Sequence, residues 1–244
     1  MAQVTKIEAL VLSRRNEGEA DRRLTLFAKE QGVLRVVAKG VRKIPSRRGG
    51  HLEPLTKIIG LAHGRPGRSY FLSGVETEEG YPGLRADGQA QEQVRVLNHL
   101  LVRVLPEEEP QPQLYARLSK LWAVLPRVAP KSRWLLETGM ACDVLRTAGL
   151  LPRLGACSDC GQGKASEAVI LDAVAGGWRC LTCHSGFSGT MFSVPAEGVE
   201  LLRLLATDPR QALRLPWREE LSRQLVNAMR GYVSQVVESA LPVV

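Results

Sequence analysis

In the first third of the chain, apolar and polar residues alternate over short runs, a period typical of β-strands that bury one face. Turn-forming residues separate these runs, namely Gly18 within the charged stretch 14–22, Gly32, and the segment HGRPGRS at 63–69. The pattern predicts strands at residues 4–12, 24–28, 33–38, 52–61 and 70–75. Five short strands joined by turns indicate a small β-barrel or sandwich, and the OB-fold is a five-stranded member of that class.

From Ala86 onward, the apolar residues recur at the three- and four-residue spacing of amphipathic helices. Between the first two helices, PEEEPQPQ at 106–113 is polar and rich in proline, which predicts a solvated linker. The helices are expected at residues 94–105, 114–125, 134–146, 199–205 and 221–237.

Positive charge is concentrated in the same third of the chain as the strands. The whole chain of 244 residues has a net charge of +8, whereas residues 1–75 hold 15 Lys and Arg against 6 Asp and Glu, a net of +9. Five of these cations follow the strand 33–38 within ten residues, interrupted by Gly40, Pro45, Ser46, Gly49 and Gly50, a composition that favours a mobile loop. Charge runs are usually solvated faces, but this run lies beside a predicted barrel, and OB-fold barrels bind nucleic acids. The candidate nucleic-acid contacts are Arg14, Arg15, Arg22, Lys39, Arg42, Lys43, Arg47, Arg48 and Lys57.

Aromatic residues are sparse in this basic region. Phe27, Tyr70 and Phe71 are the candidates for stacking on bases, and all three lie in strand patterns where packing in the core is at least as well supported. We therefore expect contacts with the phosphate backbone to dominate binding, with weak dependence on sequence.

Four of the five cysteines form two CxxC pairs, which are separated by 19 residues: Cys157 and Cys160, then Cys180 and Cys183. Each pair can direct two thiolates at one ion from a tight turn, and two pairs complete the closed tetrahedral shell of a structural zinc site. Redox-active dithiols or two disulfides are the alternatives, and His184 could in principle replace one thiolate. Four thiolates leave no open position for catalysis, so one structural zinc ion is expected to stabilise a small lobe.

Signatures of several enzyme classes are missing from the sequence. GQGKAS at 161–166 lacks the spacing of a phosphate-binding loop, and there is no GxGxxG, HExxH or nucleophile elbow. No apolar run approaches the roughly 18 residues of a membrane-spanning helix. Residues 4–12 are interrupted by Lys6 and Glu8 and lack a cleavage site for a signal peptide. We expect a cytoplasmic protein that is not an enzyme and has no membrane partner.

Together these patterns predict an α+β multidomain protein with a small five-stranded barrel or sandwich followed by a helical domain that carries an inserted four-cysteine zinc lobe; the resemblance described next implies that the barrel is an OB-fold. The expected divisions are 1–80 for the barrel, 81–152 and 191–244 for the two parts of the helical domain, and 153–190 for the zinc lobe.

Specific motifs resemble those of the bacterial RecO DNA-repair proteins: GEADR at 18–22, AKGVRK at 38–43, SRRGGHLEP at 46–54, and the CxxC pairs. The resemblance covers the whole chain in order. It implies an OB-fold domain, a helical domain and a zinc-binding segment. It also implies a nucleoid-associated protein that binds single- and double-stranded DNA, anneals complementary strands, and acts with RecR to load RecA onto DNA covered by single-strand-binding protein.

A second hypothesis is an RNA-binding, translation-associated zinc protein, because OB domains and zinc ribbons are frequent in that class of protein. Annealing with weak sequence dependence favours the first hypothesis, and dependence on the 2′-hydroxyl favours the second.

Overall fold

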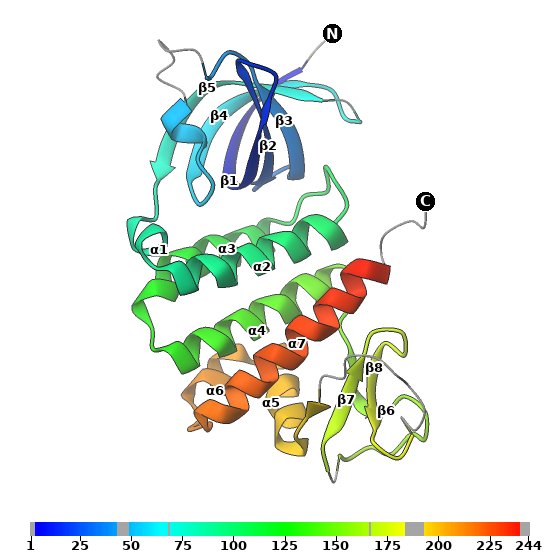
Figure 1. Cartoon of the computed structure of the whole chain (residues 1–244). Coiled ribbons are helices and arrows are strands. Elements are labelled where there is room, and N and C mark those ends of the chain that lie inside the picture. The colour runs from blue at the N-terminus through cyan, green and yellow to red at the C-terminus, as the bar shows by residue number, and fades with distance from the viewer. Residues whose placement is uncertain (1–2, 43–48, 68, 166, 184–192, 240–244) are drawn as a thin grey trace. The chain divides into compact units, whose positions relative to one another are not determined.

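A computed structural model describes residues 3–42, 49–67, 69–165, 167–183 and 193–239 (Figure 1). The chain forms two compact units. The first, here called the barrel unit, consists of residues 1–98 and 105–127, and the second, the C-terminal unit, consists of residues 99–104 and 128–244. Each is described separately below.

Five strands of the barrel unit close into a barrel in the order β1-β2-β3-β5-β4, so the predicted OB-fold is confirmed (Figure 1). All neighbouring strands are antiparallel except β3 and β5, which run parallel. The core is the inward-facing set of alternate residues, including Leu24, Leu26, Val36 and Ile58, each at most 1% exposed. The strands are β1 (Gln3–Glu17), β2 (Asp21–Ala28), β3 (Gly32–Ala38), β4 (Lys57–Gly64) and β5 (Tyr70–Glu79).

The first two strands are longer than the hydrophobic pattern predicted. Most of the stretch 14–22, expected to be a charged turn, belongs to β1 and β2, and only residues 18–20 form the turn. The strands extend because their backbones stay paired as far as Glu17 opposite Asp21, and the ion pair of Glu17 with Arg23 adds attraction to a ladder in which Arg15 lies opposite Arg23. The fourth strand is displaced from the prediction of 52–61 and lies at Lys57–Gly64, and Leu52 instead ends a 3₁₀ turn (Gly49–Leu52) and is buried in the barrel.

Most of the predicted solvated linker at 106–113 is exposed, but it also contacts the barrel, and its last two residues begin a helix. Glu107 forms a parallel β-bridge with Val33, and the backbone N–H of Glu108 donates to the carbonyl oxygen of Val33 at 3.0 Å. The Glu108 carboxylate accepts hydrogen bonds from the N–H of Gly67 at 2.9 Å and from the hydroxyl of Tyr70 at 3.3 Å. The acidic run thus binds donors that the barrel presents, a tertiary arrangement that a polar composition alone does not reveal.

Helix α3 packs on the barrel through one aromatic side chain. The ring of Tyr115 lies 5.9 Å from that of Phe27, and its hydroxyl donates to Glu8 at 3.3 Å. Burial is the main reason that the pKa of Tyr115 lies above its ordinary value. The helical elements whose residues lie partly or wholly in the barrel unit are α1 (Pro82–Ala86), α2 (Gly88–Val104), α3 (Pro112–Val124) and the 3₁₀ turn Leu125–Arg127.

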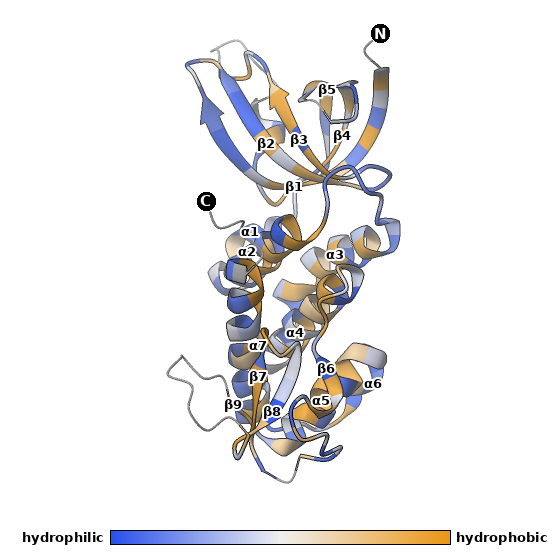
Figure 2. Ribbon diagram, turned by 90° about the vertical axis from the view of Figure 1, so that its right-hand side faces the viewer, coloured by the Kyte–Doolittle hydropathy of each residue, from blue (hydrophilic) through white to orange (hydrophobic). Residues whose placement is uncertain are grey.

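The C-terminal unit combines four helices with a small sheet of order β6-β8-β7-β9 (Figure 1). Hydrophobic residues line β7 and α5 (Figure 2), and α7 contacts both β7 and β9. Glu137, of which 3% of the side chain is exposed, binds Arg230 at 2.6 and 2.9 Å and so joins α4 to α7. The elements are α4 (Pro130–Thr147), β6 (Arg153–Cys157), β7 (Val169–Asp172), β8 (Gly177–Cys180), β9 (Ser193–Val194), α5 (Ala196–Thr207), α6 (Pro209–Arg214) and α7 (Glu219–Ser239).

Helix α6 was not predicted, because six residues are too few to show a helical period. None of the helices in the described ranges has the length and apolar character needed to cross a membrane.

Candidate nucleic-acid interface and metal centre

The start of the basic segment is tied to the turn between β1 and β2. The backbone N–H of Arg42 donates to the carbonyl oxygen of Ala20 at 3.0 Å. The Arg42 guanidinium donates to the carbonyl oxygen of Gly18 at 2.8 Å. Asp21 accepts a hydrogen bond from the N–H of Gly40 at 2.8 Å, and Gly40 has a φ of 67°, a conformation that favours glycine. Lys39 and Arg42 therefore lie at the same end of the barrel as the arginines of the β1–β2 hairpin.

The four hairpin arginines lie on two faces of the barrel wall. Arg15 and Arg23 are direct cross-strand neighbours on the outer face, and Glu17 forms an ion pair with Arg23. The hydrogen bond from the Arg23 guanidinium to the Glu17 carboxylate lowers the pKa of Glu17 and so favours its charged form. Arg14 and Arg22 belong to the alternate residues that face inward, as shown by the pairing of Arg14 with the buried Leu24. The hairpin thus presents guanidinium groups on both faces.

Glu53 bridges the two inward-facing arginines. Its Oε2 lies 2.9 Å from Nη2 of Arg14, and its Oε1 lies 3.2 Å from Nη1 of Arg22. Guanidinium groups bind carboxylates and phosphates in the same way, through paired N–H···O hydrogen bonds. The site between Arg14 and Arg22 that Glu53 occupies is therefore also suited to a phosphate. The sequence analysis did not single out Glu53, because an isolated acid after a basic run carries no distinguishing pattern.

Lys57 is not brought to this end of the barrel. Its Nζ lies 2.9 Å from Glu8 and 3.2 Å from Glu78, and 17% of its side chain is exposed. Burial lowers the pKa of Lys57, but the hydrogen bonds to these two carboxylates outweigh it, so the net shift is upward. We leave Lys57 out of the interface proposed below. Lys43, Arg47 and Arg48 lie outside the described residues.

The three aromatic candidates differ sharply in exposure. Phe27 is completely buried against α3, and Tyr70 is half-buried against the barrel core. Phe71 is 42% exposed, and the Nζ of Lys39 lies 4.4 Å from the centroid of its ring. Among these three, Phe71 is the one whose side chain is substantially exposed, and a cation already lies over its ring.

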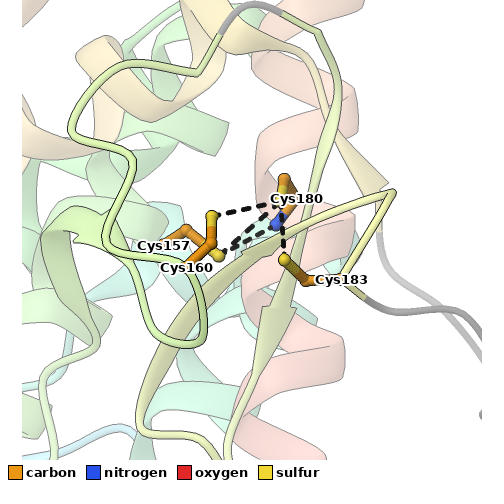
Figure 3. A group of neighbouring side chains, drawn as sticks. All are labelled: Cys157, Cys160, Cys180 and Cys183. Atoms are coloured by element: carbon orange, nitrogen blue, oxygen red, sulfur yellow. Dashed lines mark hydrogen bonds between the residues drawn. The ribbon is translucent and has the colours of Figure 1, made fainter.

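The four CxxC cysteines converge on one point, which is consistent with a single metal ion (Figure 3). All four sulfur atoms lie within 4.8 Å of one another, with separations of 3.7 Å for Cys157 to Cys180, 3.8 Å for Cys160 to Cys180 and 3.2 Å for Cys180 to Cys183. Sulfur atoms at zinc–sulfur bond length in a tetrahedral shell lie about 3.8 Å apart. The cysteines carry free thiols, so these residues could hold a metal ion.

Nearby donors favour the thiolate form of Cys157 and Cys180, whereas the neighbouring Cys180 side chain is the main reason that the pKa of Cys183 rises to about 12. The hydroxyl of Thr182 contributes most to lowering the pKa of Cys180 to about 6, followed by the side chain of Cys183. Burial opposes ionisation of Cys157, but N–H groups of Cys160 and Cys180 outweigh burial, and the pKa of Cys157 falls below its ordinary value. His184 lies outside the described residues.

Arg203 of α5 supports the first CxxC turn. Its guanidinium donates to the carbonyl oxygens of Leu154 at 2.7 Å, Gly155 at 3.1 Å and Gly163 at 3.3 Å. These carbonyl groups flank Cys157 and Cys160. The indole N–H of the buried Trp178 also donates to the carbonyl oxygen of Leu154, at 3.1 Å. Sequence analysis missed Arg203 because it lies 43 residues after Cys160 on a separate helix.

Comparison with known proteins gives a consistent result over nearly the whole chain. Residues 1–81 match the family model for the N-terminal part of recombination protein O, and residues 87–243 match the model for its C-terminal part. The chain is 29% identical to the DNA repair protein RecO of Desulfitobacterium hafniense strain Y51, over 96% of this chain and 85% of that protein. It is 34% identical to the protein of the same name from Anaeromyxobacter sp. strain K, over 93% and 89%.

Proposed function

The chain belongs to the RecO family of DNA repair and recombination proteins, and from this premise we propose that it binds single- and double-stranded DNA at the hairpin end of its barrel and anneals complementary strands. The observation that carries the proposal is the network that ties Gly40 and Arg42, and with them the start of the basic segment, to the β1–β2 turn. It gathers cations from two separate segments at one end of an OB-fold barrel, a fold that binds nucleic acids through strands and loops.

We propose that Arg14, Arg15, Arg22, Lys39 and Arg42 contact phosphates, together with Lys43, Arg47 and Arg48 of the adjoining segment. Two DNA strands repel each other through their phosphates. A cationic surface that neutralises both strands holds them together long enough for complementary bases to find their partners. No covalent bond is made or broken in this process, so the proposed role is not enzymatic.

The metal centre is proposed to bind one zinc ion through Cys157, Cys160, Cys180 and Cys183. Four thiolates fill a tetrahedral shell, so the ion would support the folded lobe and would not bind substrate. As partners within the cytoplasm we propose RecR and single-strand-binding protein, with loading of RecA as the outcome.

Strand annealing tests the function directly. Two complementary labelled strands, each covered with single-strand-binding protein, are expected to anneal faster with this protein than without it, and faster again when RecR is present.

The salt dependence of binding is a second test. With six to ten phosphate contacts, affinity for DNA should fall about a thousandfold or more between low and physiological salt. Replacing the DNA by RNA of the same sequence is the control. Tighter binding that depends on the 2′-hydroxyl would contradict the proposal and favour an RNA-binding role.

Glu53→Gln is expected to strengthen DNA binding. The substitution removes the carboxylate that competes with phosphate for Arg14 and Arg22, and about fivefold tighter binding at low salt corresponds to about 1 kcal/mol. Titration of a labelled oligonucleotide measures the effect. Glu30→Gln makes the same charge change at the β2–β3 turn, the opposite end of β2 from the hairpin, and should have a smaller effect. Equal gains in both variants would show that Glu53 acts only through net charge.

A further inference from the structure

Three apolar side chains and one histidine form a row across the outer face of the barrel beside the cationic end. Residues paired across neighbouring strands point to the same face of a sheet, and the pairing runs from Val37 of β3 to Phe71 of β5, then to His63 of β4 and Val4 of β1. We call these four residues the outer-face row. Phe71 is 42% exposed and Val4 is 55% exposed, so the row presents apolar surface to solvent.

Strand alternation explains why Phe71 lies outside the barrel. Its neighbours Tyr70 and Leu72 pack against the core, while Ser73 returns to the outer face and lies 2.6 Å from Nε2 of His63. An outward-facing phenyl ring in a strand adds nothing to the barrel core. Its position requires a different explanation from the core packing that the sequence pattern suggested.

Cations flank the outer-face row. The ammonium of Lys39 lies over the Phe71 ring at 4.4 Å, and Arg23 of β2 is the cross-strand neighbour of Val37. On β1, the exposed Lys6 points to the same face as Val4, two residues away. An apolar strip bordered by positive charges matches a ligand that has flat apolar groups on an anionic backbone.

We propose that the outer-face row binds the unpaired bases of single-stranded DNA, with one base stacked on the ring of Phe71. The inference rests on the proposed DNA-binding function and adds the part of the ligand that the site recognises. The row crosses four neighbouring β-strands and is therefore about 14 Å long. Successive nucleotides of a stacked DNA strand are about 3.4 Å apart, so the row accommodates several nucleotides. Paired bases lie inside the duplex with their faces covered, so this contact distinguishes single strands from duplex DNA. An annealing protein gains from such a contact, because the completed duplex no longer makes it.

Phe71→Ala tests the contact. It should weaken binding of oligothymidine about tenfold and leave binding of duplex DNA within about twofold, since phosphate contacts dominate duplex binding. The salt dependence should not change, because no phosphate contact is removed. An abasic oligonucleotide of the same length should bind the variant and the wild-type protein equally, because it has no base to stack on residue 71. Val174→Ala, at an 87% exposed position in the C-terminal unit, is the control and should bind all three DNAs normally.

Phe71→Trp provides a second readout. The four native tryptophans, Trp122, Trp134, Trp178 and Trp217, all lie after residue 81, so the new indole would report from the barrel. Oligothymidine should quench its additional fluorescence and the abasic oligonucleotide should not.

Unchanged oligothymidine binding by Phe71→Ala, with no quenching in Phe71→Trp, would overturn the proposal and leave a protein partner as the occupant of this face. The double variant Lys39→Ala, Arg42→Ala is measured in parallel to separate this failure from failure of DNA binding itself. If only that variant loses affinity, the base contact is wrong and the phosphate interface stands. If the unchanged protein binds none of the DNAs, the proposed function is wrong as well.

Discussion

Replacing Lys39, Arg42, Arg47 and Arg48 with alanine is expected to weaken binding of single-stranded DNA by about 100- to 1,000-fold near 0.1 M salt. Each phosphate contact on a single strand contributes about 0.7 to the slope of log affinity against log salt, so four lost contacts reduce that slope by about 2.8. The difference between variant and unchanged protein should therefore vanish near 1 M salt. Fluorescence anisotropy of a labelled oligonucleotide over a range of salt concentrations measures both quantities.

A charge-matched variant separates local contact from net charge. Alanine at Arg210, Arg214, Arg218 and Arg223 also lowers the net charge from +8 to +4, but these residues belong to the C-terminal unit. It should change affinity by less than about tenfold. Equal losses in the two variants would contradict the assignment of the interface to the barrel. Thermal unfolding must accompany the measurement, because Arg42 also holds the β1–β2 turn.

Replacing Cys157 and Cys160 with serine is expected to abolish metal binding and unfold the lobe. Structural zinc contributes about 10 kcal/mol or more to the folding of small zinc domains, so the small sheet β6-β8-β7-β9 should not remain folded without it. Metal analysis of the purified protein should fall from one equivalent to none, and proteases should cleave within residues 153–194. DNA binding by the barrel should persist within about threefold, because the cysteines belong to the other compact unit.

Cys142→Ala is the matched control for the metal site. Cys142 is completely buried in α4 and does not belong to the group of four cysteines whose sulfur atoms converge, so its loss should leave the metal site intact. This variant should retain one equivalent of metal. Full metal content in the Cys157 and Cys160 variant, or an unchanged protein that is equally stable after treatment with a chelator, would contradict the structural role.

Local patterns in the sequence were sufficient for most of the fold. Alternation of period two identified five strands, and helical spacing identified the long helices that bury Leu118, Leu145 and Leu225. The two CxxC pairs identified the four cysteines that could hold a metal ion, because the spacing within each pair is local and only the meeting of the pairs depends on the fold. The boundaries of β1 and β2 were missed, since charged residues in a ladder carry no hydrophobic signal.

Features that depend on distant residues could not be predicted from the sequence. The acids at 107–109 resemble a solvated linker until the barrel supplies donors such as Gly67 and Tyr70. Arg203 becomes a support for the metal lobe only when α5 lies beside β6. In both cases charged residues of this kind are usually exposed to solvent. Their hydrogen-bond partners lie dozens of residues away in the sequence, so no local pattern reveals the contact.

The sequence alone determined which residues are basic and that they gather in the first 75 positions, because charge is a property of composition. The tertiary structure decided how those cations are used. Barrel closure places Lys57 between Glu8 and Glu78, and it places Glu53 between Arg14 and Arg22. The alternation of β5 points Phe71 outward beneath Lys39. The register that closes the barrel brings residues from distant strands together, and no local pattern in the chain specifies those meetings.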